Sequence, residues 1–398
     1  MKTLIWTKYI ELKNCGGPSG YLYNIKEYLN AHSVPEICFY PVEYKEPTKY
    51  IPKGGILLSM RNFAKDCLAL YRFVKKIRVC YNTKEELTED DRDLIDKFDF
   101  VHVHNIPDFL RSFVDFHNGH TKIVLTTHYP EPMADEIAEE FGCEWVWRLF
   151  PSLRNHYIRI ETSVFKKADY IMFPVPEAKE PYVNKSFLYK ETFESVKDKF
   201  FYVPTCLSST NKKVDNNHVL DKYLIPNETL KVCYVGRHTE VKGYDLIQKI
   251  AQCLWDSKKD VYFIIGGKQI PLHGLKDSRW IELGWVDTQS LLNEVDVFLL
   301  PNKDTYFDLI LLEVLRQGTP VILSRTGGNK WFEERNKNGM FFFDKDDINE
   351  AVCCLTDLIE AKKNGKLDEM KGINEGFYKK TFDMKNYIQS YINSLTQR

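Results

Sequence analysis

The chain has 398 residues, of which 43% are hydrophobic and 14% aromatic, enough for two domains of about 150–200 residues each. With 55 basic and 56 acidic residues it has no global charge that would favour nucleic acid, and we expect no such partner. The ten cysteines show no CxxC pair and no metal-ligand spacing, which is typical of reduced thiols in a cytoplasmic protein. We expect no signal peptide in residues 1–14 and no segment that is long and apolar enough to span a membrane.

Short runs of Val, Ile, Phe and Tyr predict strands along the first half of the chain. They are Thr3–Thr7, Ile37–Val42, Ile56–Ser59, Val79–Asn82, Phe98–His104, Ile123–His128, Tyr170–Val175 and Phe201–Pro204. Between several of these runs the apolar period is helical. Tyr21, Ile25, Tyr28 and Leu29, for example, share one face of a helix that opens just after a glycine turn.

The second half repeats the pattern. Strands are predicted at Val232–Val235, Val261–Ile265, Trp280–Leu283, Val297–Leu300 and Pro320–Ser324, alternating with helices near 244–256, 288–294 and 308–317. Such alternation predicts α/β domains, each a doubly wound parallel sheet with helices on both faces.

The domain boundary is predicted from composition. Residues 208–231 are polar and turn-rich, which is typical of an interdomain connection, so we expect domains at 1–205 and 206–376. The last segment, 377–398, carries a helical apolar stripe from 382 to 395 that needs a surface to cover, and we expect this helix to pack back on the first domain.

The segment Cys233–Gly243 combines a buried-strand pattern with a glycine turn that holds an arginine and a lysine. The strand would deliver Gly236 to the carboxyl edge of a parallel sheet, where such sheets bind ligands, beside the start of the next helix. Arg237 could grip phosphate oxygens as a fork and Lys242 could act as a mobile point charge. The segment therefore predicts a diphosphate site, although by itself it is also compatible with a surface turn that holds two solvated cations.

Four features in this order resemble the retaining, nucleotide-sugar-dependent glycosyltransferases of family 4, which have the GT-B fold of two Rossmann-like domains facing a cleft. They are the glycine loop Gly16-Gly17, the histidine-ending strands Phe100–Asn105 and Val124–His128, the turn Val235–Gly243, and the helix and strand Phe307–Ser324 followed by Thr-Gly-Gly. The ordered set extends over some 300 residues and is much more specific than the turn alone.

The resemblance implies a transferase that moves a sugar from a nucleotide-sugar, with a UDP-sugar favoured, to a glycan or lipid-linked saccharide with retention of anomeric configuration. It implies no metal and no cofactor other than this donor. A role in bacterial surface polysaccharide synthesis, at the cytoplasmic face of the membrane, is expected from the resemblance alone. Two alternatives stay open: a non-catalytic GT-B subunit that binds a glycan or a partner enzyme, and, less well supported, a nucleotide-sugar epimerase.

The same resemblance assigns the donor site to Gly16, Gly17, Gly236, Thr305, Asp308, Leu309 and Glu313. Glu313 would bind the ribose hydroxyls. Where the family usually has a first glutamate eight positions earlier this chain has Thr305, and where it has a glycine this chain has Asp308. Asp308 stands where a helix begins, so we expect its side chain to cap residues 310 and 311. These changes indicate either a different grip on the donor sugar or a loss of turnover.

Arg237, Lys242 and His128 are the predicted catalytic residues. The two cations would stabilise negative charge on the leaving phosphate, and the acceptor hydroxyl would attack on the leaving-group side without a protein nucleophile. His128 would contact the donor sugar or its developing charge. His104 is a weaker candidate, and we expect His102 to point to the opposite face of its strand and to pack.

Some other patterns leave two explanations open. Residues 61–84 hold seven basic residues among apolar ones, as in a helix that contacts an anionic lipid carrier or bilayer, or equally in one that packs on the sheet. The aromatic and basic cluster at 145–159 fits sugar stacking or an interdomain helix. Gly266-Gly267 is expected near the nucleotide, and Trp285 either by the base or packed in the core. Asp344-Lys-Asp346 has the DxD spacing of a metal motif, but it follows Met340–Phe343 in what we expect to be a turn, and no metal is expected.

Overall fold

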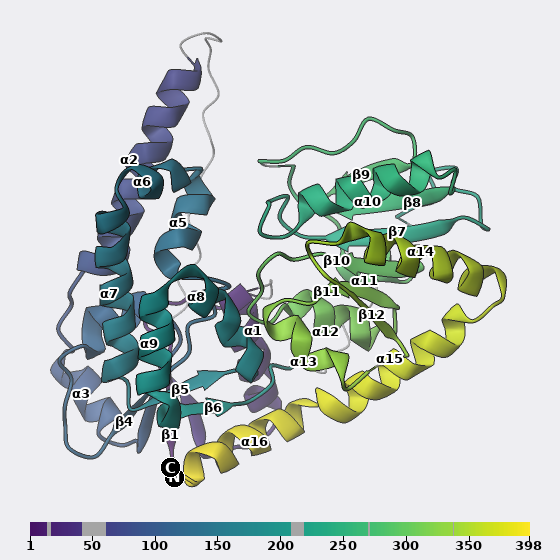
Figure 1. Ribbon diagram of the computed structural model, residues 1–398. Coiled ribbons are helices and arrows are strands. Elements are labelled where there is room, and N and C mark those ends of the chain that lie inside the picture. The colour runs from purple at the N-terminus through teal and green to yellow at the C-terminus, as the bar shows by residue number, and fades with distance from the viewer. Residues whose placement is uncertain (14–16, 42–60, 208–218, 270, 337) are drawn as a thin grey trace.

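The computed structural model describes residues 1–13, 17–41, 61–207, 219–269, 271–336 and 338–398, although not the side chains of 61–66. Two six-stranded sheets, both parallel throughout, form two bodies that stand side by side in Figure 1. The predicted strand Ile56–Ser59 lies outside the described residues.

The first sheet has the order β2-β1-β3-β4-β5-β6. Its strands are β1 Thr3–Trp6, β2 Ile37–Phe39, β3 Phe100–Val103, β4 Lys122–Leu125, β5 Tyr170–Phe173 and β6 Phe200–Tyr202. The helices among them are α1 Gly17–Ala31, α2 Arg61–Asn82, α3 Glu89–Ile95, α4 Ile106–Asp108, α5 Met133–Phe141, α6 Glu144–Leu149, α7 Pro151–Lys167, α8 Glu180–Lys185 and α9 Phe187–Ser195. Shorter turns are η1 Phe109–Phe113, η2 Pro176–Lys179 and η3 Lys197–Lys199.

The second sheet has the order β12-β11-β10-β7-β8-β9. Its strands are β7 Leu230–Val235, β8 Val261–Gly266, β9 Trp280–Gly284, β10 Val297–Leu300, β11 Val321–Ser324 and β12 Met340–Phe343. The helical segments are α10 Tyr244–Asp256, α11 Thr288–Leu292, α12 Leu309–Arg316, η4 Gly327–Asn329, α13 Lys330–Glu333, α14 Ile348–Lys363, α15 Leu367–Thr381 and α16 Met384–Thr396.

The central strands are apolar and covered on both faces. Every residue of β3 and of β10 is buried, as expected for parallel strands between helix layers. The helices bury one stripe: in α10 this stripe includes Ile247, Ile250, Ala251 and Leu254, at the spacing of one helical face. One buried cluster covers the first sheet and continues across one face of the second, and a separate cluster covers the other face of the second sheet.

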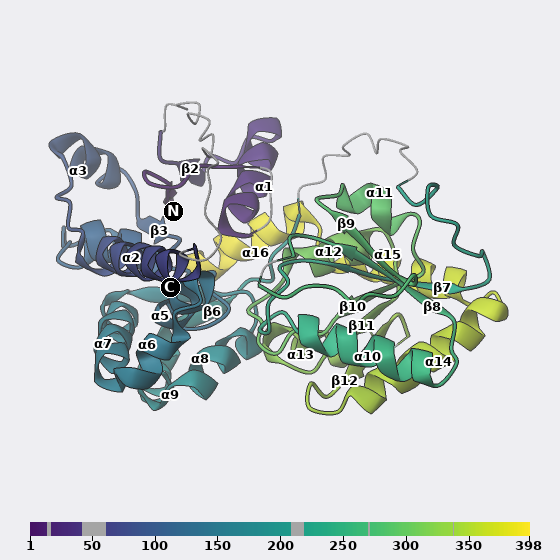
Figure 2. The ribbon, with the colours of Figure 1, turned by 90° about the horizontal axis from the view of Figure 1, so that it is seen from above.

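The C-terminal helices join the two bodies. α15 packs against α12 in the second body, and the chain then turns at Phe382 and Asp383 into α16. In Figures 1 and 2, α16 runs from the second body to the first. Its Tyr387 hydroxyl hydrogen-bonds the hydroxyl of Tyr21 on α1, and its Tyr391 hydroxyl lies 2.8 Å from Nδ1 of His102.

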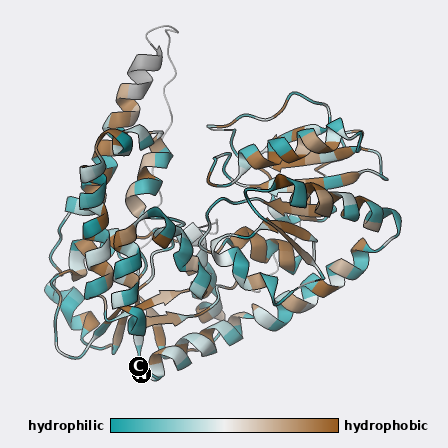
Figure 3. Ribbon diagram, viewed as in Figure 1, coloured by the Kyte–Doolittle hydropathy of each residue, from teal (hydrophilic) through white to brown (hydrophobic). Residues whose placement is uncertain are grey.

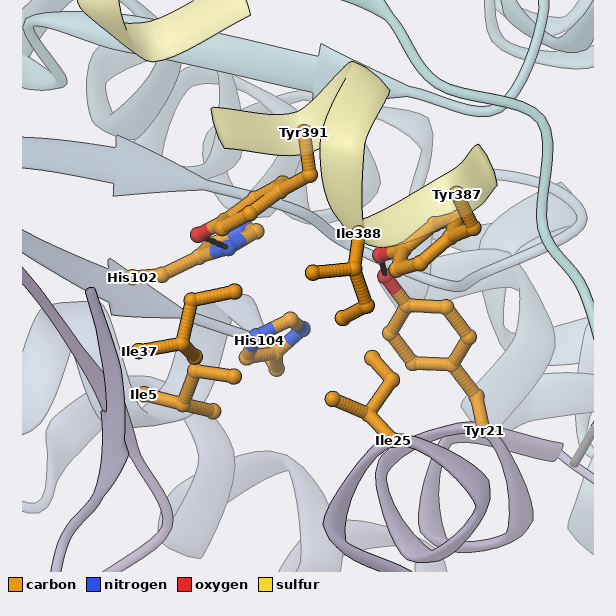
Figure 4. Close-up of a pocket in the computed structure, with 9 residues that line it drawn as sticks. All are labelled: Ile5, Tyr21, Ile25, Ile37, His102, His104, Tyr387, Ile388 and Tyr391. Atoms are coloured by element: carbon orange, nitrogen blue, oxygen red, sulfur yellow. Dashed lines mark hydrogen bonds between the residues drawn. The ribbon is translucent and has the colours of Figure 1, made fainter. Parts of the chain in front are cut away.

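Figure 4 shows this junction from inside. Side chains from β1, β2, β3, α1 and α16 surround a small space, with the two tyrosine contacts drawn as dashed lines. Ile5, Ile25 and Ile388 line it together with the polar rings, and the space leaves no room for a bound ligand. The junction is therefore packing between α16 and the first sheet.

One local prediction was wrong, and one strand was not predicted. Residues 79–82 are not a strand but the last turn of α2, because Phe73, Ile77, Cys80 and Tyr81 are buried at helical spacing. Residues 340–343 form the edge strand β12, which pairs in parallel with β11 and was not among the predicted strands, while Asp344–Asp346 lie in the turn after it, as expected. In both cases a short apolar run was compatible with two structures, and packing against the rest of the domain decided between them.

Candidate functional site

The strand orders locate a binding crevice in each body. In the second sheet the chain runs from β7 to β8 and β9, then returns to the other side of β7 to form β10. The loops after β7 and β10 therefore diverge at a switch point, the usual ligand crevice of an open parallel sheet. These loops are residues 236–243 and 301–308, and their backbones touch where Lys303 N–H donates to the Val241 carbonyl at 2.8 Å. The equivalent point of the first sheet lies between β1 and β3.

Glycines allow the 236–243 turn to approach its neighbours closely. Gly243 has φ of 68°, and a Cβ there would lie 1.8 Å from the Pro301 carbonyl oxygen. Gly267, just after β8, has φ of 126°, and its Cβ would meet the Gly236 carbonyl oxygen at 2.0 Å. Gly266-Gly267 thus lies against the turn, as expected for a second glycine loop, while both positions need a residue without a side chain.

Lys242 pairs with Asp308 across the switch point. Its Nζ lies 2.7 Å from Asp308 Oδ1, while Oδ2 of the same carboxylate accepts hydrogen bonds from the Asn302 amide and, at 3.1 Å, from the Thr305 hydroxyl. Burial raises the pKa of the Asp308 carboxyl, but Lys242, Asn302 and Thr305 outweigh it and hold the pKa below its usual range. Asp308 is therefore ionised at neutral pH and neutralises the lysine.

This network corrects the expected role of Asp308. The residue does precede α12, but its side chain makes no capping bond to residues 310 or 311. The Lys242 ammonium and the two polar neighbours take both carboxylate oxygens instead, and Lys242 is a charged partner that the backbone amides of α12 are not. Thr305 is fully buried, and its hydroxyl donates a hydrogen bond to Asp308.

Arg237 faces a carboxylate from the first body. Its guanidinium lies 3.7 Å from Glu136 on α5, and Glu139 of the same helix interacts with Thr239 and the Val241 backbone. Burial raises the pKa of Glu136 to about 7, although Arg237 partly offsets it. The acidic face of α5 therefore lies against the basic turn. The spacing Glu136, Glu139, Glu140 on one helix was the sequence signal for this contact, and it was missed.

His104 and His128 lie side by side at the carboxyl ends of the central strands of the first sheet. His104 Nδ1 lies 3.0 Å from His128 Nε2, and the His128 ring also packs on Tyr21 and Tyr306, the latter from the second body. Burial lowers the pKa of His128 to about 3, so its ring is neutral at pH 7. His128 also has φ of 58°, a strained backbone for a residue other than glycine, of the kind that clusters at functional sites.

The expected orientation of His102 was wrong. Side chains alternate along a strand, so residues two apart share a face, and the rings of His102 and His104 lie 3.9 Å apart. His102 does pack, as expected: it is buried, and its second ring nitrogen lies 2.8 Å from the Thr126 hydroxyl. It joins the sheet to α16 and does not face the crevice between the bodies.

The other residues predicted for the donor site that the structure describes lie at the start of α1, just after β7 and on α12. Gly17 opens α1 with φ of 79°, and Gly16 lies outside the described residues. Gly236 donates its N–H to the Gly266 carbonyl at 3.1 Å. Leu309 and Glu313 lie on α12, partly buried, one helical turn apart and just beyond Asp308.

The structure also places two other candidates, Trp285 and the Asp344-Lys-Asp346 motif. Trp285 is 92% exposed, so it is not packed in the core; it follows β9 next to Val286, whose side chain approaches Gly266. Asp344 and Asp346 lie on the surface after β12, and among the described residues no group of His, Cys, Asp and Glu could hold a metal ion. The described helices also include none that is both long and apolar enough to cross a membrane.

Ion pairs join the two bodies. Lys330, on α13, lies 2.7 Å from Glu180 on α8, and Lys185 on α8 lies between Glu131 at 3.3 Å and Asp304 at 3.5 Å. The loops after β5 and β11 touch as well. The carboxyl ends of both sheets therefore face each other, with the basic turn and the histidines on the two sides.

Residues 229–360 match the family model described as glycosyl transferases group 1. The match covers the second sheet and most of its helices, including the basic turn and α12. Among curated proteins, the chain is 22% identical over 307 residues to an uncharacterized 41.2 kDa protein in the cps region of Klebsiella pneumoniae, covering 74% of this chain and 79% of that protein. It is 26% identical over 269 residues to the O-antigen biosynthesis glycosyltransferase WclY of Escherichia coli, covering 62% and 67%.

Solved structures show the fold. Sucrose-phosphate synthase from Thermosynechococcus elongatus superposes with a TM-score of 0.63 at 14% identity, covering 100% of this chain and 99% of that one. Anabaena HepE, solved in complex with UDP and glucose, gives a TM-score of 0.56 at 14% identity with both chains covered completely. The fold is therefore GT-B, as the sequence predicted.

Proposed function

We propose that this chain is a metal-independent glycosyltransferase that moves a sugar from a nucleotide-sugar, with a UDP-sugar favoured, to a glycan or lipid-linked saccharide with retention of configuration. The observation that carries the proposal is the placement of Arg237 and Lys242 at the β7/β10 switch point, on a turn that glycines keep close to its neighbours. The group 1 family match over this region supports it. HepE, solved with UDP and glucose, supports the choice of base, and WclY, an O-antigen biosynthesis glycosyltransferase, supports a role in surface polysaccharide synthesis.

In the proposed reaction, negative charge develops on the phosphate as the bond to the anomeric carbon breaks. Arg237 and Lys242 would stabilise this charge more in the transition state than in the ground state, the task that a metal ion performs in other transferases. The acceptor hydroxyl would attack from the leaving-group side and pass its proton to the phosphate. Neutral His128 would act by hydrogen bonding to the donor sugar and not as a cation. Glu313 would hold the ribose hydroxyls.

For the diphosphate to bind, both cations must exchange their present partners. A phosphate oxygen would replace Glu136 at Arg237, while Lys242 would share its ammonium between the phosphate and Asp308. Asp308 is hydrogen-bonded to Thr305, and it would therefore lie on the side of the site that holds the donor sugar. We propose that it takes the place of the glutamate that the family usually has eight positions before Glu313, by accepting a sugar hydroxyl.

The proposal is tested by the melting temperature of the purified protein with UDP, GDP, dTDP and CMP and their sugar conjugates, with Arg237→Ala in parallel. A ligand at about 100 times its dissociation constant stabilises by roughly 2.7 kcal/mol, and we expect one base to do so in the wild type only. Transfer to saccharide acceptors is then followed by NMR of the anomeric proton, with and without EDTA. Failure of every nucleotide would contradict the proposal, while binding without transfer to any acceptor would favour a non-catalytic GT-B subunit.

Glu136 predicts how donor binding depends on pH. Its pKa is raised to about 7, so the carboxylate forms as the pH rises through 7, and it then competes with phosphate for Arg237. Affinity for a nucleotide-sugar should therefore fall between pH 6 and 8 in the wild type, by up to about fivefold, the scale of one partly exposed ion pair. Glu136→Gln should bind equally at both values. Calorimetry with a nucleotide-sugar, whose phosphates do not titrate near pH 7, measures this.

The matched control is Glu140→Gln, an exposed carboxylate on the same helix, which should keep the wild-type pH dependence. Stability gives a second measurement. Because the folded pKa of Glu136 lies above its unfolded value, the carboxyl opposes folding increasingly as the pH rises from about 4.5 to 7. Glu136→Gln should therefore melt higher than the wild type at pH 8 but not at pH 4. Identical pH profiles for the wild type and Glu136→Gln would show that this carboxylate does not compete.

A further inference from the structure

The exposed apolar side chains are concentrated at one end of the first domain. Among the described residues, twelve large hydrophobic side chains are exposed, and eight of them lie in two short segments: Leu68, Tyr71, Val74 and Val79 on α2, and Trp145, Leu149, Phe150 and Leu153 around the α6–α7 turn. Tyr71 is 63% exposed and Leu149 65%. Such concentration is unusual on a soluble surface, where large apolar residues are scattered singly.

The two segments form one surface. α5 packs against both α2 and α6, and the Phe73 ring on α2 lies 5.3 Å from the Trp147 ring on α6, edge to face. Figure 1 shows α2 and α6 side by side, with α2 projecting beyond the sheet, and Figure 3 shows apolar residues along α2. We name the exposed residues of 67–82 and 145–154 the α2/α6 surface.

The charged residues of the two segments are all basic, although the exposed Glu144 directly precedes the second one. Residues 67–82 and 145–160 contain no Asp or Glu, in a chain with 56 acidic residues, and they hold the basic residues Arg72, Lys75, Lys76, Arg78, Arg148, Arg154 and Arg159. Arg154 pairs with Asp135, but the four cations of α2 all lie exposed, interleaved with the exposed apolar residues. The acidic residues that bound the second segment are Glu144 and the buried Glu161.

Packing against the domain accounts for the apolar residues on only one face of α2. Phe73, Ile77, Cys80 and Tyr81 bury one face of the helix against the domain, which is the alternative that the sequence left open. Leu68, Tyr71 and Val79 lie on the opposite side with Lys75 and Arg78. Helical geometry puts these five residues on a face that no described part of the chain covers.

We propose that the α2/α6 surface docks the protein on an anionic lipid bilayer. A nucleic acid would need cations but not exposed leucine and phenylalanine, and a neutral protein partner would not require two segments that hold seven basic residues and no acidic one. Interfacial lipid satisfies both observations, because apolar side chains enter the acyl boundary while lysine and arginine contact anionic head groups. Such docking would bring the crevice near an acceptor carried on lipid, yet it rests on the surface and not on the transferase activity.

The test is flotation of the full chain with vesicles of phosphatidylcholine alone or with 30% phosphatidylglycerol. We expect binding to the anionic vesicles only, weakened by salt because surface charges are screened. Tyr71→Ser with Phe150→Ser should abolish binding, and each of Lys75→Glu and Arg78→Glu should weaken it by at least about fivefold, since one cation near such a surface contributes about that factor.

Matched controls lie on α9, where Phe187 is 67% exposed and Lys190 is exposed as well. Phe187→Ser and Lys190→Glu should bind vesicles as the wild type does, and all variants should keep the wild-type circular dichroism and melting temperature. Arg237→Ala should also bind normally, which separates this proposal from the transferase one. Equal loss in the α9 variants, or no binding to anionic vesicles, would overturn the proposal. A Tyr71-dependent dimer in solution without vesicle binding would instead assign the surface to a second copy of the chain.

Discussion

Replacing Lys242 with alanine should lower kcat/KM by more than the same change at Arg237. Loss of one charge-stabilising donor at a reacting centre lowers kcat about 10²–10³-fold, and we expect Arg237→Ala to fall in this range. Lys242 does a second job, because it neutralises the Asp308 carboxylate at 2.7 Å. Without it, Asp308 would leave an unpaired negative charge beside the diphosphate, so Lys242→Ala should lose nucleotide affinity as well as kcat.

A double-mutant cycle separates the two roles of Lys242, the stabilisation of the leaving phosphate and the neutralisation of Asp308. Asp308→Asn in the Lys242→Ala background should recover nucleotide affinity, because the repelling charge is gone, while kcat stays low. In the wild-type background Asp308→Asn should tighten binding of the bare nucleotide diphosphate and weaken use of the nucleotide-sugar. Steady-state kinetics and calorimetry on the four proteins measure both. If Asp308→Asn gives the same change with and without Lys242, the ion pair does not couple the two residues.

Gly243→Ala should destabilise the second domain by roughly 3–5 kcal/mol, the sum of left-handed backbone strain and overlap in a packed site. The residue has φ of 68°, and its new Cβ would fall 1.8 Å from a backbone oxygen of Pro301, which a rotamer change cannot relieve. Pro301 follows β10, so any shift that makes room also moves the loop that carries Asn302 and Asp308. Calorimetric melting should show a large fall in the transition temperature, with nucleotide binding lost at temperatures where the protein is still folded.

The control for this change lies in α15. Gly372 is exposed within the helix, its φ is outside the left-handed region, and a Cβ there would meet no atom within 4 Å. Gly372→Ala should therefore raise stability by about 0.5–1 kcal/mol, since alanine loses less backbone entropy in a helix. A Gly243→Ala protein as stable as Gly372→Ala would mean that the turn is not held against β10 as the structure has it.

The sequence was sufficient for the architecture because parallel strands buried on both faces leave apolar runs that recur between helical patterns, as in β8 and β10. Short runs misled where the same residues suit two structures. Residues 79–82 look like a strand in isolation and are helical only because Phe73 and Ile77 continue the same buried face. The run Met340–Phe343 was not predicted as a strand, and it forms β12 by pairing with β11.

At the site, residue types were predictable but their partners were not. The glycine turn with Arg237 and Lys242 followed from local pattern, and so did the strand before His128, although β4 ends at Leu125. The carboxylates that face the cations come from residues 66 positions away for Asp308 and from the other domain for Glu136. No local rule connects such positions, because they meet only after both sheets and the interdomain contact have formed. The family resemblance supplied positions for Thr305 and Asp308, but not the network that joins them to Lys242 and Asn302.

The return of α16 to the first body has a consequence for synthesis on the ribosome. Tyr391 bonds His102 across 289 residues, and Tyr387 bonds Tyr21 across 366. At about 5–20 residues per second, roughly 15–60 s separate the emergence of His102 from that of its partner. The second body, continuous from β7 to α15, has all of its own strands before then. The half of the protein that is translated first therefore completes its core last, and a nascent chain stalled before residue 384 would leave part of that core open to chaperones or to aggregation.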